Sequence, residues 1–136
     1  MDKNLLQKMI TEAKDIANRN FCCKHSNFTV GVSLLTASGK IYHGFNIEND
    51  GIESICAERV TFGKALTEGE KEFTCLVVVG KKVGLPNFVK TLPCGYCRQF
   101  LNEYTNKDFK IYTYDDEEQK IYSYTLEELL PNSFSL

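Results

Sequence analysis

Residues 56–97 read CAERVTFGKALTEGEKEFTCLVVVGKKVGLPNFVKTLPCGYC. The middle of this stretch, residues 73–79, is an almost continuous apolar run of strand length, which is typical of a strand buried on both faces of a sheet. Residues 57–66 before it have helical composition and stop short of Gly69, and residues 94–104 after it predict a second helix. A buried strand between two helices indicates an α/β fold.

The segments on either side of this unit predict one sheet with helices on both faces. Residues 3–19 place Leu5, Met9 and Ala13 on one side at helical spacing. Further strands are predicted over residues 28–35, 40–47, 109–114 and 120–124, and further helices over residues 3–19 and 126–130. The resulting order, αββαβαββα, fits a five-stranded sheet in a single domain spanning residues 1–136.

The composition restricts the possible classes of function. The chain has 136 residues, 43% of them hydrophobic, and a formal net charge of -2 with acidic and basic residues interspersed. A nucleic-acid partner is not expected, because a phosphate backbone normally needs a basic patch. No apolar stretch approaches the roughly 20 residues that cross a bilayer, so no membrane segment is expected. The N-terminal segment differs from a secretory leader, so we expect a cytoplasmic protein whose six cysteines serve metal binding or catalysis.

Two short motifs at predicted helix starts carry the chemistry. They are CAE at residues 56–58 and PCGYC at residues 93–97. A helix N-terminus stabilises thiolates through unpaired N–H groups and the positive end of its dipole, and the thiolate is the form of cysteine that binds metals. Three thiolates suit Zn²⁺ and leave a fourth tetrahedral position for water. The spacing therefore predicts a catalytic zinc site with Cys56, Cys94 and Cys97 as ligands.

A catalytic zinc site also needs a group that accepts protons and a positive charge that balances the thiolates, and the residues after Cys56 can supply both. Zinc lowers the pKa of bound water to about 7, and a neighbouring carboxylate can then accept its proton. Glu58, two residues from Cys56, is predicted to move protons in this way. Because three thiolates and a hydroxide overcharge the ion, Arg59 is predicted to neutralise the site through hydrogen bonds to the ligand sulfurs.

A closed structural zinc site is the alternative interpretation. An isolated CxxC motif is common in structural sites, and Cys75, His43 or the Cys22–Cys23 pair could supply a fourth ligand. Two features favour catalysis, namely the proline directly before CxxC and the glutamate two residues after the first cysteine. Together they match the zinc-deaminase signature, which has histidine at the position of Cys56.

These motifs form part of a wider resemblance to the cytidine deaminase family, specifically to its small, homotetrameric, zinc-dependent branch. The matching blocks are SNFTVG (26–31), FNIEN (45–49), ICAER (55–59), PCGYCRQ (93–99) and LEELLPNSF (126–134). The resemblance implies a three-layer α/β/α fold with a mixed five-stranded sheet and one zinc ion per subunit. It also implies an enzyme of pyrimidine salvage, with a nucleoside substrate and sites completed by neighbouring subunits of a homotetramer.

The resemblance also assigns substrate-binding residues. It implies that Phe28 lies against the pyrimidine and that Asn46 and Glu48 hold the ribose hydroxyl. It further implies that the Ala57 N–H meets the base carbonyl and that Phe134 closes a neighbouring subunit's site. Aromatic faces do stack on bases, and positions i and i+2 of a strand do project from the same side. Without the resemblance, Phe28 would be a core aromatic and Phe134 an anchor for its own tail. Asn46 and Glu48 would then be the polar end of a strand.

The implied reaction is hydrolytic deamination of cytidine or deoxycytidine. An activated water attacks C4, Glu58 protonates N3, and loss of ammonia leaves uridine or deoxyuridine. The 49–55 loop is shorter than in typical members and lacks their tyrosine, which leaves open a modified cytosine nucleoside or a nucleoside antibiotic as the substrate. Blasticidin S deaminase also departs in this loop, but it lacks the glutamate that Glu48 provides. A non-catalytic, zinc-stabilised binding module is the alternative from another class, and polynucleotide editing is disfavoured by the acidic net charge and by Cys56.

Overall fold

The computed structural model of the protein describes residues 1–136, and its elements follow the predicted order. The helices are α1 (Lys3–Asn18), α2 (Ala57–Thr67), α3 (Gly95–Tyr104) and α4 (Leu126–Leu129). The strands are β1 (Phe28–Thr36), β2 (Ile41–Phe45), β3 (Phe73–Lys82), β4 (Lys110–Asp115) and β5 (Lys120–Thr125). None of these helices combines the length and the apolar character needed to cross a membrane.

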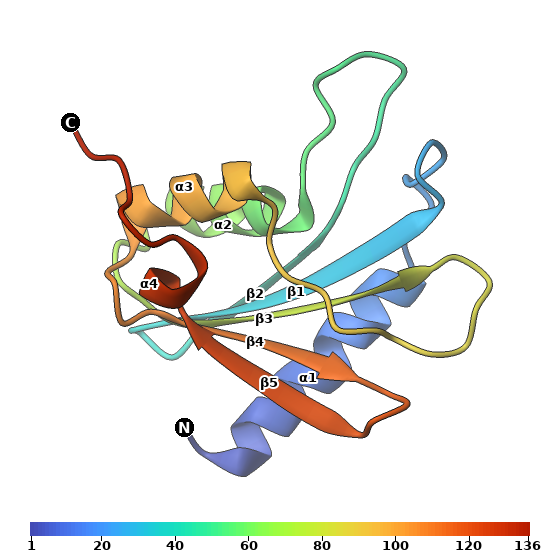
Figure 1. The fold of residues 1–136 in the computed structure, drawn as a ribbon, viewed down its shortest axis with the longest axis horizontal. Helices are drawn as coiled ribbons and strands as arrows, with labels where there is room; N and C mark the ends of the chain where they lie inside the picture. The colour runs from blue at the N-terminus through green and yellow to red at the C-terminus, as the bar shows by residue number, and fades with distance from the viewer.

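The strands form one mixed sheet in the order β2-β1-β3-β4-β5. β3 and β4 are parallel, and the other neighbouring pairs are antiparallel. Figure 1 shows α1 on one face of the sheet and α2 and α3 on the other. Because α3 lies in the crossover between the parallel strands β3 and β4, it packs on a face of the sheet beside α2. The predicted three-layer α/β/α architecture is confirmed.

The face under α1 is closely packed because small and hydroxyl-bearing residues of β1 meet the helix backbone. A Cβ on Gly31 would lie 2.0 Å from the Ala13 carbonyl oxygen, so only glycine allows this approach. The hydroxyls of Thr29 and Ser33 each donate a 2.7 Å hydrogen bond to an α1 carbonyl, which satisfies both buried groups. The buried residues of α1 are Leu6, Met9, Ile10, Ala13 and Ala17, and Leu5 is half-buried against the same cluster.

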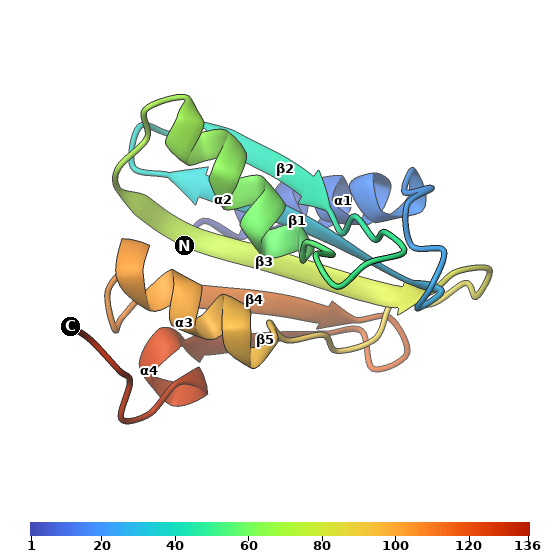
Figure 2. The ribbon, with the colours of Figure 1, turned by 90° about the horizontal axis from the view of Figure 1, so that it is seen from above.

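Aromatic rings fill the opposite face and fix α2 and α3 on the sheet. The fully buried ring of Phe62 in α2 has three aromatic neighbours. Their centroids lie 4.8 Å (Phe73), 6.0 Å (Phe100) and 6.4 Å (Phe109) from its own. Each such contact contributes about 0.5–1.5 kcal/mol beyond its buried area. Figure 2 shows the consequence, since α2 and α3 run in the same general direction and begin at the same end of the sheet.

β2 is shorter than predicted. It ends at Phe45, and Ile47 pairs instead with Ile55 in an isolated antiparallel bridge. The expectation that Asn46 and Glu48 occupy positions i and i+2 of a strand is therefore wrong. The physical reason is that the Asn46 side chain, rather than its backbone, binds the Val30 N–H and so ends the ladder between β1 and β2.

An ion pair fastens α1 to the β4–β5 turn and to the connection between β3 and α3. Lys14 Nζ lies 2.6 Å from Asp116 Oδ1, and Asp116 Oδ2 accepts a 2.6 Å hydrogen bond from the Phe88 N–H. The two charged side chains are only 25% and 22% exposed. Burial alone would raise the pKa of Asp116, but the hydrogen bonds from Lys14 and the Phe88 N–H hold it below its usual value. The pair therefore joins α1, the β4–β5 turn and the connection that leads to Cys94.

We expect Asp116→Asn to lower the free energy of unfolding by about 1–2 kcal/mol at neutral pH, because two charge-assisted hydrogen bonds lose their anion. A depressed carboxyl pKa stabilises the fold above the unfolded-state value, about 3.9. This contribution is lost as the pH falls through the folded-state value, so the difference from wild type should shrink below about pH 4. Urea unfolding across this range measures it. Glu117→Gln, at an exposed position of the same turn, is the control, and equal losses from both variants would contradict the prediction.

Candidate active site

The three predicted ligands converge at the N-termini of α2 and α3. Cys56 is the N-cap of α2, Cys94 is the N-cap of α3, and Cys97 lies in the first turn of α3. Their sulfur atoms all lie within 4.8 Å of one another, and Cys56 Sγ is 3.7 Å from Cys94 Sγ. Neither N-cap side chain is used for capping, and all the cysteines are free thiols. The structure thus brings the predicted ligand set together in a form that can bind a metal.

The geometry and chemistry of this cluster fit a zinc ion. Sulfur ligands about 2.3 Å from a tetrahedral zinc are about 3.8 Å apart, close to the 3.7 Å between Cys56 and Cys94. Hydrogen bonding with Cys97 lowers the pKa of Cys56 to about 5 and raises the pKa of Cys97. One thiol therefore ionises readily while its neighbour resists, because two thiolates this close repel each other. A divalent cation removes that resistance.

No fourth ligand completes the cluster, which contains only the three cysteines. Cys75 is buried against α1 on the opposite face, where burial raises the pKa of its thiol to about 11. His43 Nε2 instead pairs with Glu12 Oε1 at 2.9 Å. Cys22 and Cys23 lie in the connection between α1 and β1 and do not join the cluster. The arrangement therefore favours an open, catalytic site over a closed structural one.

Glu58 is buried beside the three thiols. It lies in the first turn of α2 and is only 5% exposed. Burial raises the pKa of its carboxyl to about 7, and the nearby Cys56 thiolate adds to the rise. No other residue donates a hydrogen bond to this carboxyl. The group can therefore gain and lose a proton near neutral pH, which suits a general acid and base.

Arg59 reaches from α2 to the thiol cluster. Its Nη2 lies 3.7 Å from Cys56 Sγ, the kind of contact predicted for it. Its guanidinium carbon lies 4.3 Å from the centroid of the Tyr96 ring. Its Nε is buried and has no hydrogen-bond partner. A cation is therefore held directly beside the sulfurs, where it offsets their negative charge.

Most of the hydrogen-bonding capacity of the Asn46 side chain is used within the protein. Its Oδ1 accepts hydrogen bonds from Asn20 Nδ2 at 2.8 Å and from the Val30 N–H at 2.9 Å. Its Nδ2 donates a 3.0 Å hydrogen bond to the Phe28 carbonyl. One amide hydrogen remains for a ligand. Asn46 therefore fixes the backbone that leads to Glu48 and has a single donor left for binding.

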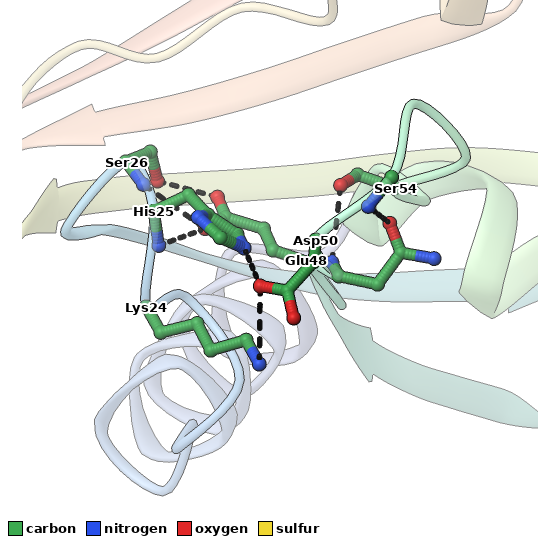
Figure 3. A network of polar contacts seen from close by, with 8 residues as sticks. Lys24, His25, Ser26, Glu48, Asp50 and Ser54 are labelled. Atoms are coloured by element: carbon green, nitrogen blue, oxygen red, sulfur yellow. Dashed lines mark hydrogen bonds and ion pairs between the residues drawn. The ribbon is translucent and has the colours of Figure 1, made fainter.

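The Glu48 carboxylate is oriented by the turn before β1, as Figure 3 shows. Its Oε1 accepts hydrogen bonds from the N–H groups of His25 and Ser26 at 2.8 and 3.0 Å, and its Oε2 accepts one from the Ser26 hydroxyl. Burial alone would raise the pKa of Glu48, but these hydrogen bonds hold it below its usual value. The carboxylate is therefore ionised at neutral pH and fixed in one orientation, with acceptor capacity to spare.

The short 49–55 loop is tied to the same turn. Asp50 Oδ1 lies 3.2 Å from His25 Nε2 and 3.8 Å from Lys24 Nζ (Figure 3). Within the loop, the Asn49 N–H donates to Ser54 Oγ at 3.3 Å. These contacts are exposed, so each contributes at most about 1 kcal/mol. They nevertheless give the shortened loop a defined path beside Glu48.

Phe28 lies half-buried at the start of β1. It lies on the same face of β1 as Val30 and Val32, which pack in the core on the α2 and α3 side of the sheet. A Cβ on Gly80 would lie 2.7 Å from Phe28 Cε2 and 2.7 Å from Thr91 Oγ1, so the ring lies directly over the Gly80 backbone. Phe28 is therefore not a fully enclosed core residue, and its ring lies on the face of the sheet that carries the thiol cluster.

Ala57 and Phe134 occupy opposite environments. Ala57 is fully buried at the first position of α2, where a backbone N–H has no intrahelical partner. Phe134 is 64% exposed, and its carbonyl accepts hydrogen bonds from Gln99 Nε2 at 2.9 Å and from Asn102 Nδ2 at 3.0 Å. The tail is thus anchored on α3 through its backbone, and the ring is free to contact another surface.

Ser26, Tyr96 and Gly80 lie against the predicted site residues Glu48, Arg59 and Phe28 but have no chemical signature of their own in the sequence. Ser26 and Tyr96 lie within the SNFTVG and PCGYC blocks, which draw attention to their neighbours. Their partners, Glu48 and Arg59, are far away along the chain. Only the fold shows that these residues meet.

Known proteins resemble the chain in sequence over nearly its whole length. Residues 3–113 match the family described as the cytidine and deoxycytidylate deaminase zinc-binding region. A cytidine deaminase of Sporosarcina psychrophila is 37% identical over 134 residues, which cover 96% of this chain and 91% of that protein. A probable cytidine deaminase of Dictyostelium discoideum is 37% identical over 136 residues, which cover 99% of this chain and 87% of that protein.

Solved structures resemble the chain in fold. The crystal structure of cytidine deaminase from Burkholderia pseudomallei has a TM-score of 0.82 and 29% identity, with 98% of this chain and 100% of that one covered. The corresponding values for cytidine deaminase from Mycobacterium leprae are 0.77 and 26%, with 96% and 100% covered. Sequence, fold and the zinc-binding motifs agree, so the chain belongs to the cytidine and deoxycytidylate deaminase family.

Proposed function

We propose that the protein is a zinc-dependent cytidine deaminase, which converts cytidine or deoxycytidine and water to uridine or deoxyuridine and ammonia. The observation that carries this proposal is the open cluster of three thiols with the buried carboxyl of Glu58 beside it. The relatives named as cytidine deaminases support it, because they match most of the chain. A role in pyrimidine salvage and a cytoplasmic location, both expected from the sequence, belong to the same proposal.

Glu58 moves the protons of the reaction. Cys56, Cys94 and Cys97 would hold the zinc ion, which would lower the pKa of a bound water to about 7. Glu58 accepts a proton from the attacking water and delivers it to N3 of the cytosine ring. Because ammonia leaves in place of an amide anion, Glu58 must also carry the remaining proton of that water from the new C4 hydroxyl to the amino group, which leaves the C4 carbonyl of the product. A carboxyl with a pKa of about 7 can take part in transfers in both directions.

Arg59 and the N-terminus of α2 place positive charge beside the ligand thiolates and the carbonyl oxygen of the base. Arg59 donates to the Cys56 sulfur and offsets the charge of the ligand thiolates. The Ala57 N–H has no partner within the helix, and it donates to the carbonyl oxygen at C2 of the base. These contacts turn C4 of the base toward Glu58.

Phe28, Asn46 and Glu48 bind the rest of the nucleoside. The Phe28 ring lies against the pyrimidine, because an aromatic face stacks on a base regardless of its polar edge. The Glu48 carboxylate, held by Ser26 and the His25 N–H, accepts from the ribose hydroxyl. The remaining amide hydrogen of Asn46 donates to the same sugar.

The active assembly is a homotetramer in which Phe134 closes the site of a neighbouring subunit. The exposed Phe134 ring and its backbone anchor on α3 support this proposal. Exposed aromatic rings are enriched at interfaces, since they bury much area for few rotatable bonds. Sedimentation analysis measures the subunit number directly, and a monomer with full activity would contradict this part.

Gly80→Ala is expected to raise KM for cytidine about 10-fold. This corresponds to a loss of about 1.4 kcal/mol of binding free energy. The added Cβ would lie 2.7 Å from the Phe28 ring, which must shift away from the base. Steady-state kinetics measure the effect. Gly63→Ala is the matched control, because its Cβ meets nothing within 4 Å and it lies in α2, where alanine is favoured. A KM equal to wild type in the Gly80 variant would contradict the role of Phe28.

A substrate panel tests the function as a whole. Zinc-loaded protein is incubated with cytidine, deoxycytidine, 5-methylcytidine and a cytosine nucleoside antibiotic, and nucleoside products and ammonia are measured. We expect uridine or deoxyuridine with stoichiometric ammonia. Turnover of the modified substrates alone would establish the alternative that the short 49–55 loop raises. Zinc binding without any turnover would identify a binding module instead.

A further inference from the structure

We propose that Tyr96 is a positioning residue, which holds the Arg59 guanidinium against the zinc-binding thiolates. The proposal rests on the zinc site described above and assigns a function to a residue between two of its ligands, Cys94 and Cys97. The Arg59 guanidinium carbon lies 4.3 Å from the centroid of the Tyr96 ring. The same guanidinium places Nη2 3.7 Å from Cys56 Sγ. The aromatic ring and the ligand sulfur therefore contact one cationic group.

An aromatic ring suits this task better than a carboxylate. A guanidinium carries its N–H donors in its plane, and a ring stacked on its face leaves all of them free for the sulfurs. A carboxylate would take two of these donors and cancel the charge. None of the ion pairs in the structure includes Arg59, so its charge is available to the thiolates.

Burial does not explain the position of the ring. Tyr96 is 68% exposed, so packing in the core does not place it. Its face contacts a residue of α2 although Tyr96 itself belongs to the first turn of α3. The contact therefore bridges the starts of the two helices that carry the metal ligands. Without it, only the contacts with the ligand sulfurs would hold the long, flexible side chain of Arg59, which could then swing into solvent.

Zinc affinity, measured by chelator competition on the zinc-loaded protein, tests the proposal. Tyr96→Leu keeps an apolar side chain but removes the aromatic face, and we expect zinc to bind about 2- to 5-fold more weakly, the range of an exposed cation–π contact. Tyr96→Phe should bind zinc like wild type, because the contact uses the ring. Tyr104→Leu, an exposed tyrosine at the other end of α3, is the matched control and should leave zinc affinity unchanged.

A double-mutant cycle shows whether Tyr96 acts through Arg59. Arg59→Gln should weaken zinc binding, and adding Tyr96→Leu to it should produce no further loss. In Co²⁺-loaded protein, both single variants should shift the thiolate-to-metal charge-transfer band in the same direction. Unchanged zinc affinity in Tyr96→Leu, or an equal additional loss in the Arg59→Gln background, would overturn the proposal. Wild-type protein that turns over cytidine would in those cases leave the proposed function standing.

Discussion

Glu58→Gln is expected to lower kcat for cytidine by about 10²- to 10⁴-fold, because an amide cannot carry the protons of the reaction, while the zinc content stays that of wild type. The substitution keeps the size and shape of a side chain that is 5% exposed. It leaves the three sulfur ligands in place. Stopped assays with cytidine and metal analysis of the same samples measure both quantities.

The free energy of unfolding of Glu58→Gln shows whether the variant loses activity because it cannot transfer protons or because its fold is destabilised. Burial raises the pKa of Glu58 to about 7, so the folded state binds its proton more tightly than the unfolded state does. Ionising such a group costs the folded state free energy as the pH rises above the unfolded value of about 4.3. Glu58→Gln should therefore be at least as stable as wild type at alkaline pH.

Glu103→Gln, an exposed acidic position on α3, is the control for this experiment and should keep full activity. If Glu58→Gln retained more than about a tenth of the wild-type kcat, the proton transfers would have to use another group, since general acid–base catalysis typically contributes about 10²- to 10⁴-fold. A large loss of zinc from the variant would also contradict the assignment. It would show that Glu58 acts on the metal site and not on the protons.

The fold could be predicted from the sequence because most of its elements are specified locally. The run at residues 73–79 has the length and apolar content of a buried strand. The spacing of Thr125 and Glu128 predicts a capping box. The structure contains both of its hydrogen bonds, because the side chain of each residue accepts one from the backbone N–H of the other. The end of β2 could not be predicted in this way. It depends on the Asn46 side chain taking the Val30 N–H from the ladder, a contact across 16 residues.

In the candidate site, too, the features specified by local sequence are predictable and the contacts between distant residues are not. The meeting of the three thiols with Glu58 nearby is predictable, because these residue types and their spacing at two helix starts follow from thiolate and proton chemistry. The orientation of Glu48 by Ser26 is a contact across 22 residues of sequence. The stacking of Tyr96 on Arg59 likewise joins two different helices. Pairwise contacts of this kind depend on how elements pack, which composition and periodicity do not specify.

Cys97→Ala is expected to abolish stoichiometric zinc binding and to lower kcat/KM for cytidine by more than about 10³-fold, because two thiolates cannot hold an open catalytic zinc. Cys97 is the most informative of the ligands to remove, since its side chain is fully buried while Cys94 is exposed. Water can replace a ligand at an exposed position more easily than at an enclosed one. Zinc analysis after gel filtration and cytidine assays measure the two losses.

Thermal stability links this loss to the metal. With free zinc at about 100 times its Kd, binding stabilises the folded wild-type protein by about 2.7 kcal/mol, so a chelator should lower its Tm. The Tm of Cys97→Ala should not respond to the chelator. Cys75→Ala is the matched control, because Cys75 is equally enclosed but lies on the α1 face. It should lose only about 1 kcal/mol, the usual cost of a methyl-sized cavity, and keep the response to the chelator. Zinc retention by Cys97→Ala would mean that the metal is held by a different set of residues.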